Sequence, residues 1–237
     1  MEVKASALML RATDYGEYDK MITLLTAEEG KISAAIKGVR KPAAKLRFAA
    51  QPFCLGEYIL SKNGGRYTVI GCSEMESFYD LRCNIDKFYA ASAICELAGS
   101  ISYEGQPSGE VFAHTVRALS DICLKDEGEQ LVKYTVYALK QLGYAISAGK
   151  CPVCGGVPPL GLVRFDMDGG AFGCLDCGTG VRASFSTYDI LRSAETDADF
   201  PDFSRDEIKR ALRLLKEYLA YKTGNQLASL SEYIRLI

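Results

Sequence analysis

The chain has 237 residues, of which 48% are hydrophobic and 24% charged, and its formal net charge of −2 indicates a globular protein rather than a strongly basic one. No apolar run approaches the length of a membrane span, and the first residues lack the pattern of a signal peptide, so we expect neither a membrane protein nor a secreted one. Nine cysteines, an odd number with five scattered among apolar residues, favour a reducing cytoplasm over a disulfide framework.

The amino-terminal part of the chain carries the patterns of five short strands. We expect them over residues 3–12, 21–26, 31–37, 54–61 and 67–73, the last two joined by a hairpin-turn signal at residues 62–65. Five short strands with one long connection before the fourth are typical of a small closed barrel of the OB type. The sequence therefore predicts an OB domain over residues 1–78.

Most of the basic charge in this domain lies on or beside the long connection, residues 38–52. The window from residue 31 to residue 47 holds six basic residues and no acidic one, so it carries +6 and leaves −8 for the rest of the chain. The six are Lys31, Lys37, Arg40, Lys41, Lys45 and Arg47. A solubilising loop is one explanation, but ordinary surfaces mix both signs. We therefore interpret the six as a nucleic-acid-binding site that neutralises phosphates.

OB barrels that bind single strands usually add aromatic side chains on which bases stack. Phe48 and Phe53 lie beside the basic connection, and Tyr58 and Tyr67 lie on expected strands. For Phe53, Tyr58 and Tyr67, each taken singly, a place in the barrel core is the favoured alternative.

From about residue 79 onward the apolar periodicity changes to that of helices. Apolar residues recur at three- and four-residue steps over residues 85–98, 111–122, 131–142 and 204–221. Ser204 and Glu207 form a capping box at the start of the last of these. The sequence therefore predicts a helical domain over residues 79–237.

The last expected helix has a basic face. Our candidates for partner binding on it are Lys209, Arg210 and Arg213. Most such faces are simply solvated, and Glu217 interrupts this one, so the face is weaker support for a binding site than the basic connection.

Two C-x2-C pairs interrupt the helical pattern, Cys151 with Cys154 and Cys174 with Cys177. Two short strands with a Gly-rich turn lie between the pairs, so we expect an inserted hairpin over residues 151–177 and an α+β fold class for the chain. Four thiolates with no open position are typical of a structural Zn²⁺ site and not of a catalytic one. Disulfides, unliganded thiols or bound iron are the alternatives.

The sequence offers little for catalysis. His114 is the one histidine, and it lies on an expected helix, where such a residue is far more often structural or solvated than catalytic. Neither a G-x-S-x-G elbow nor a P-loop is present. The zinc deaminase pattern fails, because it needs an upstream His/Cys-x-Glu motif and an open metal position. We therefore do not expect an enzyme.

Several short segments, taken together and in order, resemble the bacterial recombination mediator family RecO over nearly the whole chain. They are residues 7–10, 15–20, 24–26, 30–31, 37–41 and 51–53, and then 142–144 and 222–224. The chain departs from the family at Ala43 and Ala44, where family loops often carry Ser.

The resemblance implies an N-terminal OB fold, a helical domain and, in members with four cysteines, a zinc site that does not carry the activity. It implies a non-enzymatic role in DNA repair and recombination: binding single- and double-stranded DNA, annealing complementary strands, and helping to load recombinase onto DNA coated by single-stranded DNA-binding protein. The implied partners are RecR and the acidic C-terminal tail of single-stranded DNA-binding protein, and the implied location is the cytoplasm, in association with the nucleoid.

Two other functions stay open from the residues alone. One is a protein-interaction adaptor that docks its partners through the helical domain and the zinc hairpin, with the barrel as a stabilising part. The other is a zinc-ribbon RNA-binding factor. Neither needs the six basic residues to gather on one surface, so their arrangement in the fold bears on the choice.

Overall fold

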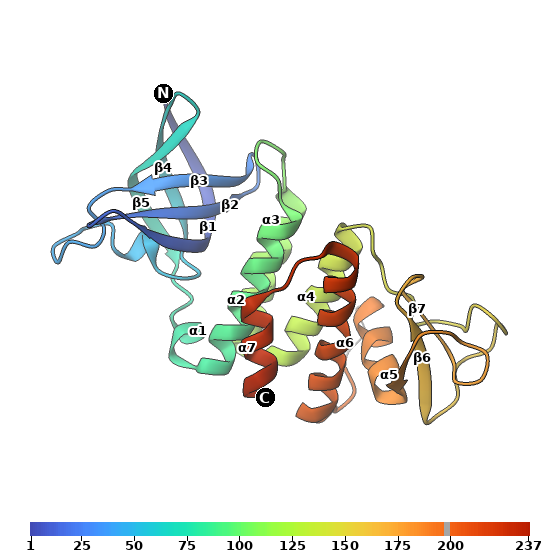
Figure 1. Cartoon of the computed structure of the whole chain (residues 1–237). Helices are drawn as coiled ribbons and strands as arrows, with labels where there is room; N and C mark the ends of the chain where they lie inside the picture. Colours follow the sequence, from blue (N-terminus) through green and yellow to red (C-terminus); the bar gives the residue numbers. More distant parts are fainter. Residues whose placement is uncertain (197–199) are drawn as a thin grey trace. The chain divides into compact units, whose positions relative to one another are not determined.

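Five strands close into a barrel in the amino-terminal part of the computed structural model, which describes residues 1–196 and 200–237 (Figure 1). The strands are β1 (Glu2–Tyr15), β2 (Asp19–Thr26), β3 (Gly30–Ile36), β4 (Leu55–Asn63) and β5 (Arg66–Glu76). Their order around the barrel is β1-β2-β3-β5-β4, with β1 closing onto β4 and with β3 and β5 running parallel. The OB-type barrel expected from the strand pattern is confirmed.

Alternating apolar residues supply the core of the barrel. Met9 on β1, Leu24 on β2 and Ile32 on β3 are all buried in it. β1 and β2 extend further than their apolar residues predict, because backbone pairing continues past the core and sets Asp14 opposite Lys20. The extension brings polar side chains to the end of the barrel where the two strands turn.

The long connection between β3 and β4 consists of turns and one short 3-10 helix, η1 (Phe48–Ala50). Ala49 and Ala50 are buried in the barrel core, so the carboxyl-terminal half of the connection is held against the barrel. The connection is therefore not a free loop, and its basic side chains have a defined support.

Three helices follow the barrel: α1 (Tyr79–Cys83), α2 (Ile85–Ile101) and α3 (Gly109–Leu124). The side-chain oxygen of Asn84 caps α2 by accepting hydrogen bonds from two backbone N–H groups of its first turn. The helix contacts β1, and its Phe88 ring lies 5.6 Å from the ring of Phe53, two residues before β4. Barrel and helices together form one compact unit, Met1–Lys125.

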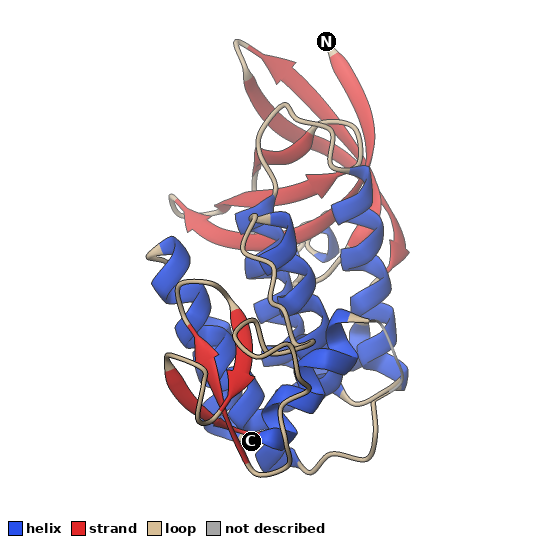
Figure 2. Ribbon diagram, turned by 90° about the vertical axis from the view of Figure 1, so that its right-hand side faces the viewer, coloured by secondary structure: helices blue, strands red, loops and turns tan. Residues whose placement is uncertain are grey.

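The second compact unit, Asp126–Ile237, combines helices with a small antiparallel sheet. Its helices are α4 (Glu127–Gln141), α5 (Phe185–Glu195), α6 (Arg205–Thr223) and α7 (Ala228–Leu236). The sheet has the order β7-β6-β8, formed by β6 (Leu162–Asp166), β7 (Ala171–Cys174) and β8 (Val181–Ser184), and is drawn in red in Figure 2. The expected α+β class, with a cysteine-bearing hairpin among helices, is confirmed; the strand β8 and the helices α1, α5 and α7 are additions to it.

At the start of α6, the carboxylate of Glu207 accepts a hydrogen bond from the backbone N–H of Ser204 at 2.9 Å, as the capping box predicts. The division into compact units falls after Lys125, whereas the sequence suggested domains over residues 1–78 and 79–237. Compactness does not test which segments fold independently, so those two domains stay a prediction. Within the described residues, no helix has both the length and the hydrophobicity that a membrane span needs.

Candidate nucleic-acid interface and metal centre

The turn between β1 and β2 and the start of the basic connection are tied together at one end of the barrel. The backbone N–H of Arg40 donates to Tyr18 O at 3.0 Å, and the backbone N–H of Gly38 donates to the Asp19 carboxylate at 2.7 Å. These bonds position the first turn of the connection against the β1–β2 turn. The two segments therefore present their side chains on a common surface.

Five of the six predicted basic residues share this surface, and the sixth does not. Lys37, Arg40, Lys41, Lys45 and Arg47 are exposed on the connection. The side chain of Arg47 donates to Lys41 O at 3.2 Å and so holds the two halves of the connection together. Lys31 is half-buried, and its ammonium donates to Gly99 O at the end of α2, at 2.7 Å. Lys31 is thus engaged in holding a helix and is not part of the basic surface.

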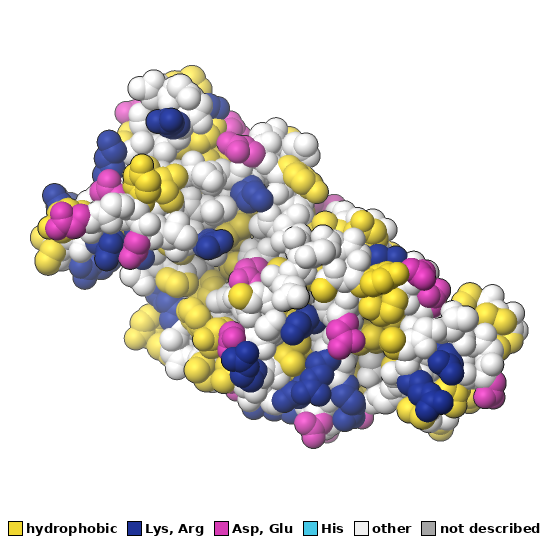
Figure 3. Space-filling model, viewed as in Figure 1, with side chains coloured by type: hydrophobic (Ala, Val, Ile, Leu, Met, Phe, Trp, Pro, Cys, Tyr) yellow, Lys and Arg dark blue, Asp and Glu magenta, His cyan; other side chains and the backbone are white. Residues whose placement is uncertain are grey.

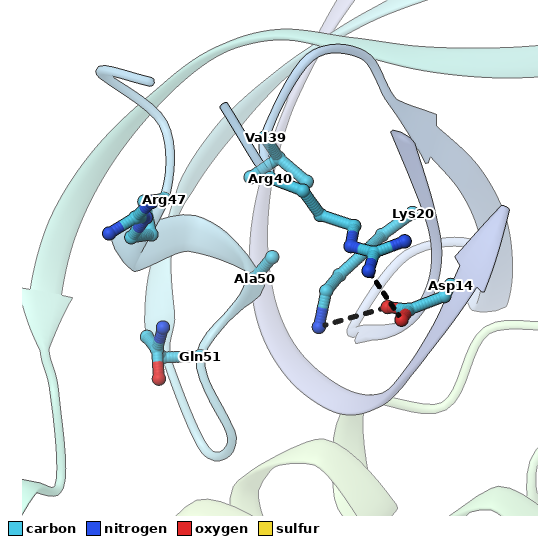
Figure 4. Close-up of a pocket in the computed structure, with 7 residues that line it drawn as sticks. All are labelled: Asp14, Lys20, Val39, Arg40, Arg47, Ala50 and Gln51. Carbon is cyan, nitrogen blue, oxygen red and sulfur yellow. Dashed lines mark ion pairs between the residues drawn. The ribbon is translucent and has the colours of Figure 1, made fainter. Parts of the chain in front are cut away.

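A hollow of about 300 Å³ opens between the β1–β2 turn and the connection (Figure 4). It is lined by Asp14, Lys20, Val39, Arg40, Arg47, Ala50 and Gln51. Three basic side chains and one carboxylate line the hollow, which gives it a formal net charge of +2, and two of the three, Arg40 and Lys20, point at the carboxylate of Asp14 (Figure 4). Such a hollow is suited to an anion of the size of a phosphate group.

Sequence reasoning missed Lys20 and Gln51. Lys20 follows a run of acidic residues, and it looks neutralised by them along the chain. The register of β1 with β2 does pair it with one of these acids, Asp14, but it also brings both side chains to the lining of the hollow. The register was not predictable, because the paired residues there are polar and lack an apolar pattern.

The surface at this end of the barrel mixes basic and acidic groups, as the left-hand tip of the molecule shows in Figure 3. Asp14 lies 3.3 Å from Arg40 and 3.6 Å from Lys20, and all three side chains are at least partly exposed. Exposed pairs of this kind contribute only about 0–1 kcal/mol, so they do not lock the basic groups away from a ligand. Lys37, Lys41, Lys45 and Arg47 form no ion pair among the residues that the structure describes.

Three of the aromatic candidates belong to the interior. Phe53, Tyr58 and Tyr67 have exposed fractions of 2%, 0% and 6%. The hydroxyl of Tyr58 donates to Ala49 O at 2.8 Å, and that of Tyr67 donates to the Glu29 carboxylate at 2.7 Å. A place in the barrel core is therefore the correct alternative for Tyr58 and Tyr67, whereas Phe53 is buried beside Phe88 of α2, and none of the three offers a ring face to a base. Phe48 is half-buried and packs against the same core.

The four expected ligand sulfurs converge at one point in the second unit. Cys151 Sγ lies 3.4 Å from Cys177 Sγ, Cys154 Sγ lies 3.7 Å from Cys174 Sγ, and all four sulfurs lie within 4.8 Å of one another. A tetrahedral site with Zn–S bonds of about 2.3 Å sets its sulfurs about 3.8 Å apart. All nine cysteines are free thiols, so the disulfide alternative is wrong. The cluster can hold a metal ion with four sulfurs.

Each cysteine pair lies on a tight turn closed by a backbone hydrogen bond. Gly155 N–H donates to Cys151 O at 2.9 Å, with φ of 73° at the glycine, and Gly178 N–H donates to Cys174 O at 2.8 Å. Arg164 on β6 supports the second turn, because its guanidinium donates to the backbone oxygens of Leu175 and Gly180 at 2.9 and 3.0 Å. Sequence reasoning missed Arg164, since a single arginine on a strand carries no signal for the carbonyls that it bonds.

The protonation of the cluster follows from its hydrogen bonds. The backbone N–H of Cys154, helped by those of Cys174 and Val153, lowers the pKa of the Cys151 thiol to about 6. The sulfur contact with Cys151 is the main cause that raises the pKa of Cys177 to about 12. These hydrogen bonds favour the thiolate at Cys151 and the protonated thiol at Cys177, and a divalent cation at the centre of the cluster would stabilise all four sulfurs as thiolates.

Aromatic rings tie the cysteine hairpin to the helices of its unit. The ring of Phe165 on β6 lies 4.8 Å from that of Phe172 on β7 and 5.2 Å from that of Tyr218 on α6. The ammonium of Lys222 on the same helix donates to Asp168 O in the hairpin turn at 2.7 Å. The hairpin is therefore part of the core of this unit, which agrees with a structural role for a bound metal.

The three candidates for partner binding lie on α6, but they differ in availability. Arg210 and Arg213 are exposed. Lys209 is half-buried, and its ammonium donates to Ile237 O at 2.6 Å. The structure thus leaves two of the three side chains open to solvent.

Two family models match the chain: one described as Recombination protein O N terminal, over residues 1–78, and one described as Recombination protein O C terminal, over residues 82–231. A DNA repair protein RecO of Desulfitobacterium hafniense is 37% identical over 178 residues, which are 74% of this chain and 64% of that protein. One of Acetivibrio thermocellus is 30% identical over 65% of this chain and 62% of its own length. The chain therefore matches a little under two thirds of the length of these relatives.

A third relative matches over a larger share of both chains. The DNA repair protein RecO of Myxococcus xanthus is 30% identical over 229 residues, which are 94% of this chain and 93% of that protein. The matches to both models and to this relative cover the barrel, the helices and the cysteine hairpin.

Proposed function

This chain belongs to the RecO family of DNA repair and recombination proteins, and from that premise we propose that it binds single- and double-stranded DNA and anneals complementary strands without acting as an enzyme. The observation that carries the proposal is the group of five exposed basic residues at one end of an OB-type barrel, namely Lys37, Arg40, Lys41, Lys45 and Arg47. Lys20 adds a sixth positive charge at the adjoining hollow. Clustered Lys and Arg side chains neutralise phosphates and release counterions, whatever the base sequence.

The same charge accounts for annealing. Two strands that approach each other repel through their phosphates, and a compact cationic surface that binds both lowers this repulsion. Complementary bases can then test their pairing without a chemical energy source. Because the contacts are made to the backbone, the binding has no sequence preference, as a general annealing factor requires.

We further propose that the chain helps to load recombinase onto DNA coated by single-stranded DNA-binding protein, in the cytoplasm and at the nucleoid. Its partners in this step would be RecR and the acidic C-terminal tail of single-stranded DNA-binding protein. Arg210 and Arg213, exposed on α6, are candidates to bind that tail, because an acidic peptide needs accessible guanidinium groups.

The metal that the four cysteines would hold is, we propose, Zn²⁺ in a structural role. Zn²⁺ accepts four thiolates in a closed tetrahedral site, and such a site contributes to folding and leaves no position for a substrate. The aromatic contacts of the hairpin with α5 and α6 support this assignment. The barrel and the metal site then have separate tasks, DNA binding and stability.

One experiment tests the proposal. Fluorescence anisotropy with a labelled single strand, a duplex of the same length and an RNA strand, each at two salt concentrations, measures affinity and its salt dependence. We expect binding to both DNA forms that weakens with salt, and ATP-independent annealing of complementary oligonucleotides in parallel. Binding with no dependence on salt, or to RNA alone, would contradict the proposal.

A further inference from the structure

An exposed aromatic ring that was not among the stacking candidates from the sequence lies beside the basic surface. Tyr18, in the turn between β1 and β2, is 43% exposed. The ammonium of Lys41 lies 5.4 Å from the centroid of its ring. Its backbone oxygen accepts the hydrogen bond from Arg40, a residue that lines the hollow. The Tyr18 ring thus contacts Lys41, and its backbone is bonded to Arg40, which lines the hollow.

We infer that this end of the barrel is a nucleotide subsite, in which an unpaired base stacks on the ring of Tyr18 while a neighbouring phosphate enters the hollow between Arg40 and Lys20. The inference rests on the proposed DNA binding and deepens it, because it names single-stranded DNA with unstacked bases as the preferred ligand. A duplex keeps its bases stacked on one another and cannot offer a free face to the ring.

The contacts of Tyr18 suit this task. A Lys ammonium over a tyrosine ring is a weak attraction at an exposed site, so a base can replace it on the ring. The ammonium of Lys41 is then released to a phosphate of the same strand. Stacking on a tyrosine tolerates every base, since each base has a π face, and it keeps the site without sequence preference.

The other exposed tyrosines of the same unit, Tyr15, Tyr79 and Tyr103, do not combine these features. Tyr79 has the guanidinium of Arg82 at 5.6 Å from its ring, but it begins α1 and lies on neither turn of the basic surface. Tyr15 is one residue beyond Asp14 on β1, so its side chain leaves the strand on the face opposite to the hollow. Tyr103 is 57% exposed, but it lies at the other end of β3. Its backbone oxygen accepts a hydrogen bond from the backbone N–H of Lys31, near the first residue of that strand, whereas the basic connection begins after the last residue of the strand. Tyr103 therefore serves as a matched control for Tyr18.

The test compares two oligonucleotides with equal numbers of phosphates, a thymidine strand and an abasic strand of the same length. Anisotropy titrations at one low salt concentration give the ratio of their affinities for the unmodified chain and for the variants Tyr18→Leu, Tyr18→Phe, Tyr103→Leu and Lys41→Gln. We expect the unmodified chain to favour the strand with bases by roughly 5- to 150-fold, the effect of a stacked base on an aromatic side chain. Tyr18→Leu should lose most of that ratio, while Tyr18→Phe and Tyr103→Leu keep it.

The remaining outcomes separate the subsite from DNA binding itself. Lys41→Gln should weaken both oligonucleotides alike and leave the ratio unchanged, because it removes a phosphate contact. If Tyr18→Leu keeps the full ratio, or weakens both strands equally, Tyr18 does not stack on bases and the inference is wrong although DNA binding stands. If the unmodified chain binds neither strand, the proposed function fails and the subsite with it.

Discussion

The carboxylate of Asp14 lies 3.3 Å from the guanidinium of Arg40, inside the hollow that we assign to a DNA phosphate. The same carboxylate lies 3.6 Å from the ammonium of Lys20, so it already pairs with both cations that a phosphate would bind. A phosphate that enters the hollow must displace this carboxylate from its partners or accept its repulsion. We therefore expect Asp14 to limit the affinity of the site for DNA and to keep Arg40 and Lys20 ordered when no DNA is bound.

Replacing Asp14 with Asn removes the competing charge and conserves the shape of the side chain. We expect the affinity for single-stranded DNA to rise about two- to fivefold at low salt, the range that exposed ion pairs support. Anisotropy titrations check the change. Glu57→Gln is the matched control. Glu57 on β4 pairs with Lys4 on β1 at 3.2 Å, and it is not among the residues that line the hollow. A loss of affinity in Asp14→Asn would mean that the carboxylate positions Arg40 for binding.

Neutralising the first turn of the connection tests the phosphate contacts. If about four basic residues contact a single strand, the logarithm of affinity falls against the logarithm of salt with a slope of about −3. The variant Lys37→Ala/Arg40→Ala/Lys41→Ala should reduce that slope to about −1 and weaken binding to all sequences equally. Titrations of oligonucleotides with different compositions over a salt series measure both effects.

A variant with the same change of charge controls for general electrostatics. Lys4, Arg117 and Lys125 are exposed residues of the same unit, and each has an acidic partner. Replacing all three with Ala should leave the slope near −3, because only contacting residues release counterions. An equal loss of slope in both triple variants would show that net charge, and not the connection, governs binding.

Lys31 and Lys45 should behave in opposite ways, although the sequence placed them in one basic group. Lys31→Met removes the hydrogen bond to Gly99 O and should lower the free energy of unfolding by about 1–2 kcal/mol, with the DNA affinity of the folded protein unchanged. Lys45→Met, at an exposed position, should leave stability unchanged and weaken DNA binding. Urea unfolding and anisotropy on the same samples separate the two. If Lys31→Met and Lys45→Met lose DNA affinity equally, Lys31 contacts DNA as well.

Lys31 also shows where sequence reasoning ends. The barrel was predictable, because strand alternation and one long connection specify it, and so was the convergence of four cysteines, because their spacing repeats a metal-binding pattern. The bond of Lys31 to Gly99 was not, since it joins a strand to a helix 68 residues away. The roles that we propose for Lys20 and Tyr18 depend on the register of a polar hairpin, which carries no apolar signal.

Removing the metal tests the separation of tasks between the two units. Cys151 is buried beneath the turns of the hairpin, and Cys154 is exposed, so Cys154→Ser breaks the site with the smaller change in packing. We expect about one Zn²⁺ per chain in the unmodified protein, loss of that Zn²⁺ in the variant, and a destabilisation of the second unit by several kcal/mol. Cys83→Ser, at an exposed free cysteine in the first unit, should change neither the Zn²⁺ content nor the stability of the second unit.

The same samples decide whether the metal serves DNA binding. Metal analysis gives the Zn²⁺ content, thermal unfolding gives the stability, and anisotropy below the melting temperature gives the DNA affinity. Because the basic connection is supported by the barrel core at Ala49 and Ala50, Cys154→Ser should bind single-stranded DNA with the affinity of the unmodified chain. A variant that unfolds at the normal temperature and yet fails to bind DNA would instead place the cysteine hairpin at the DNA interface.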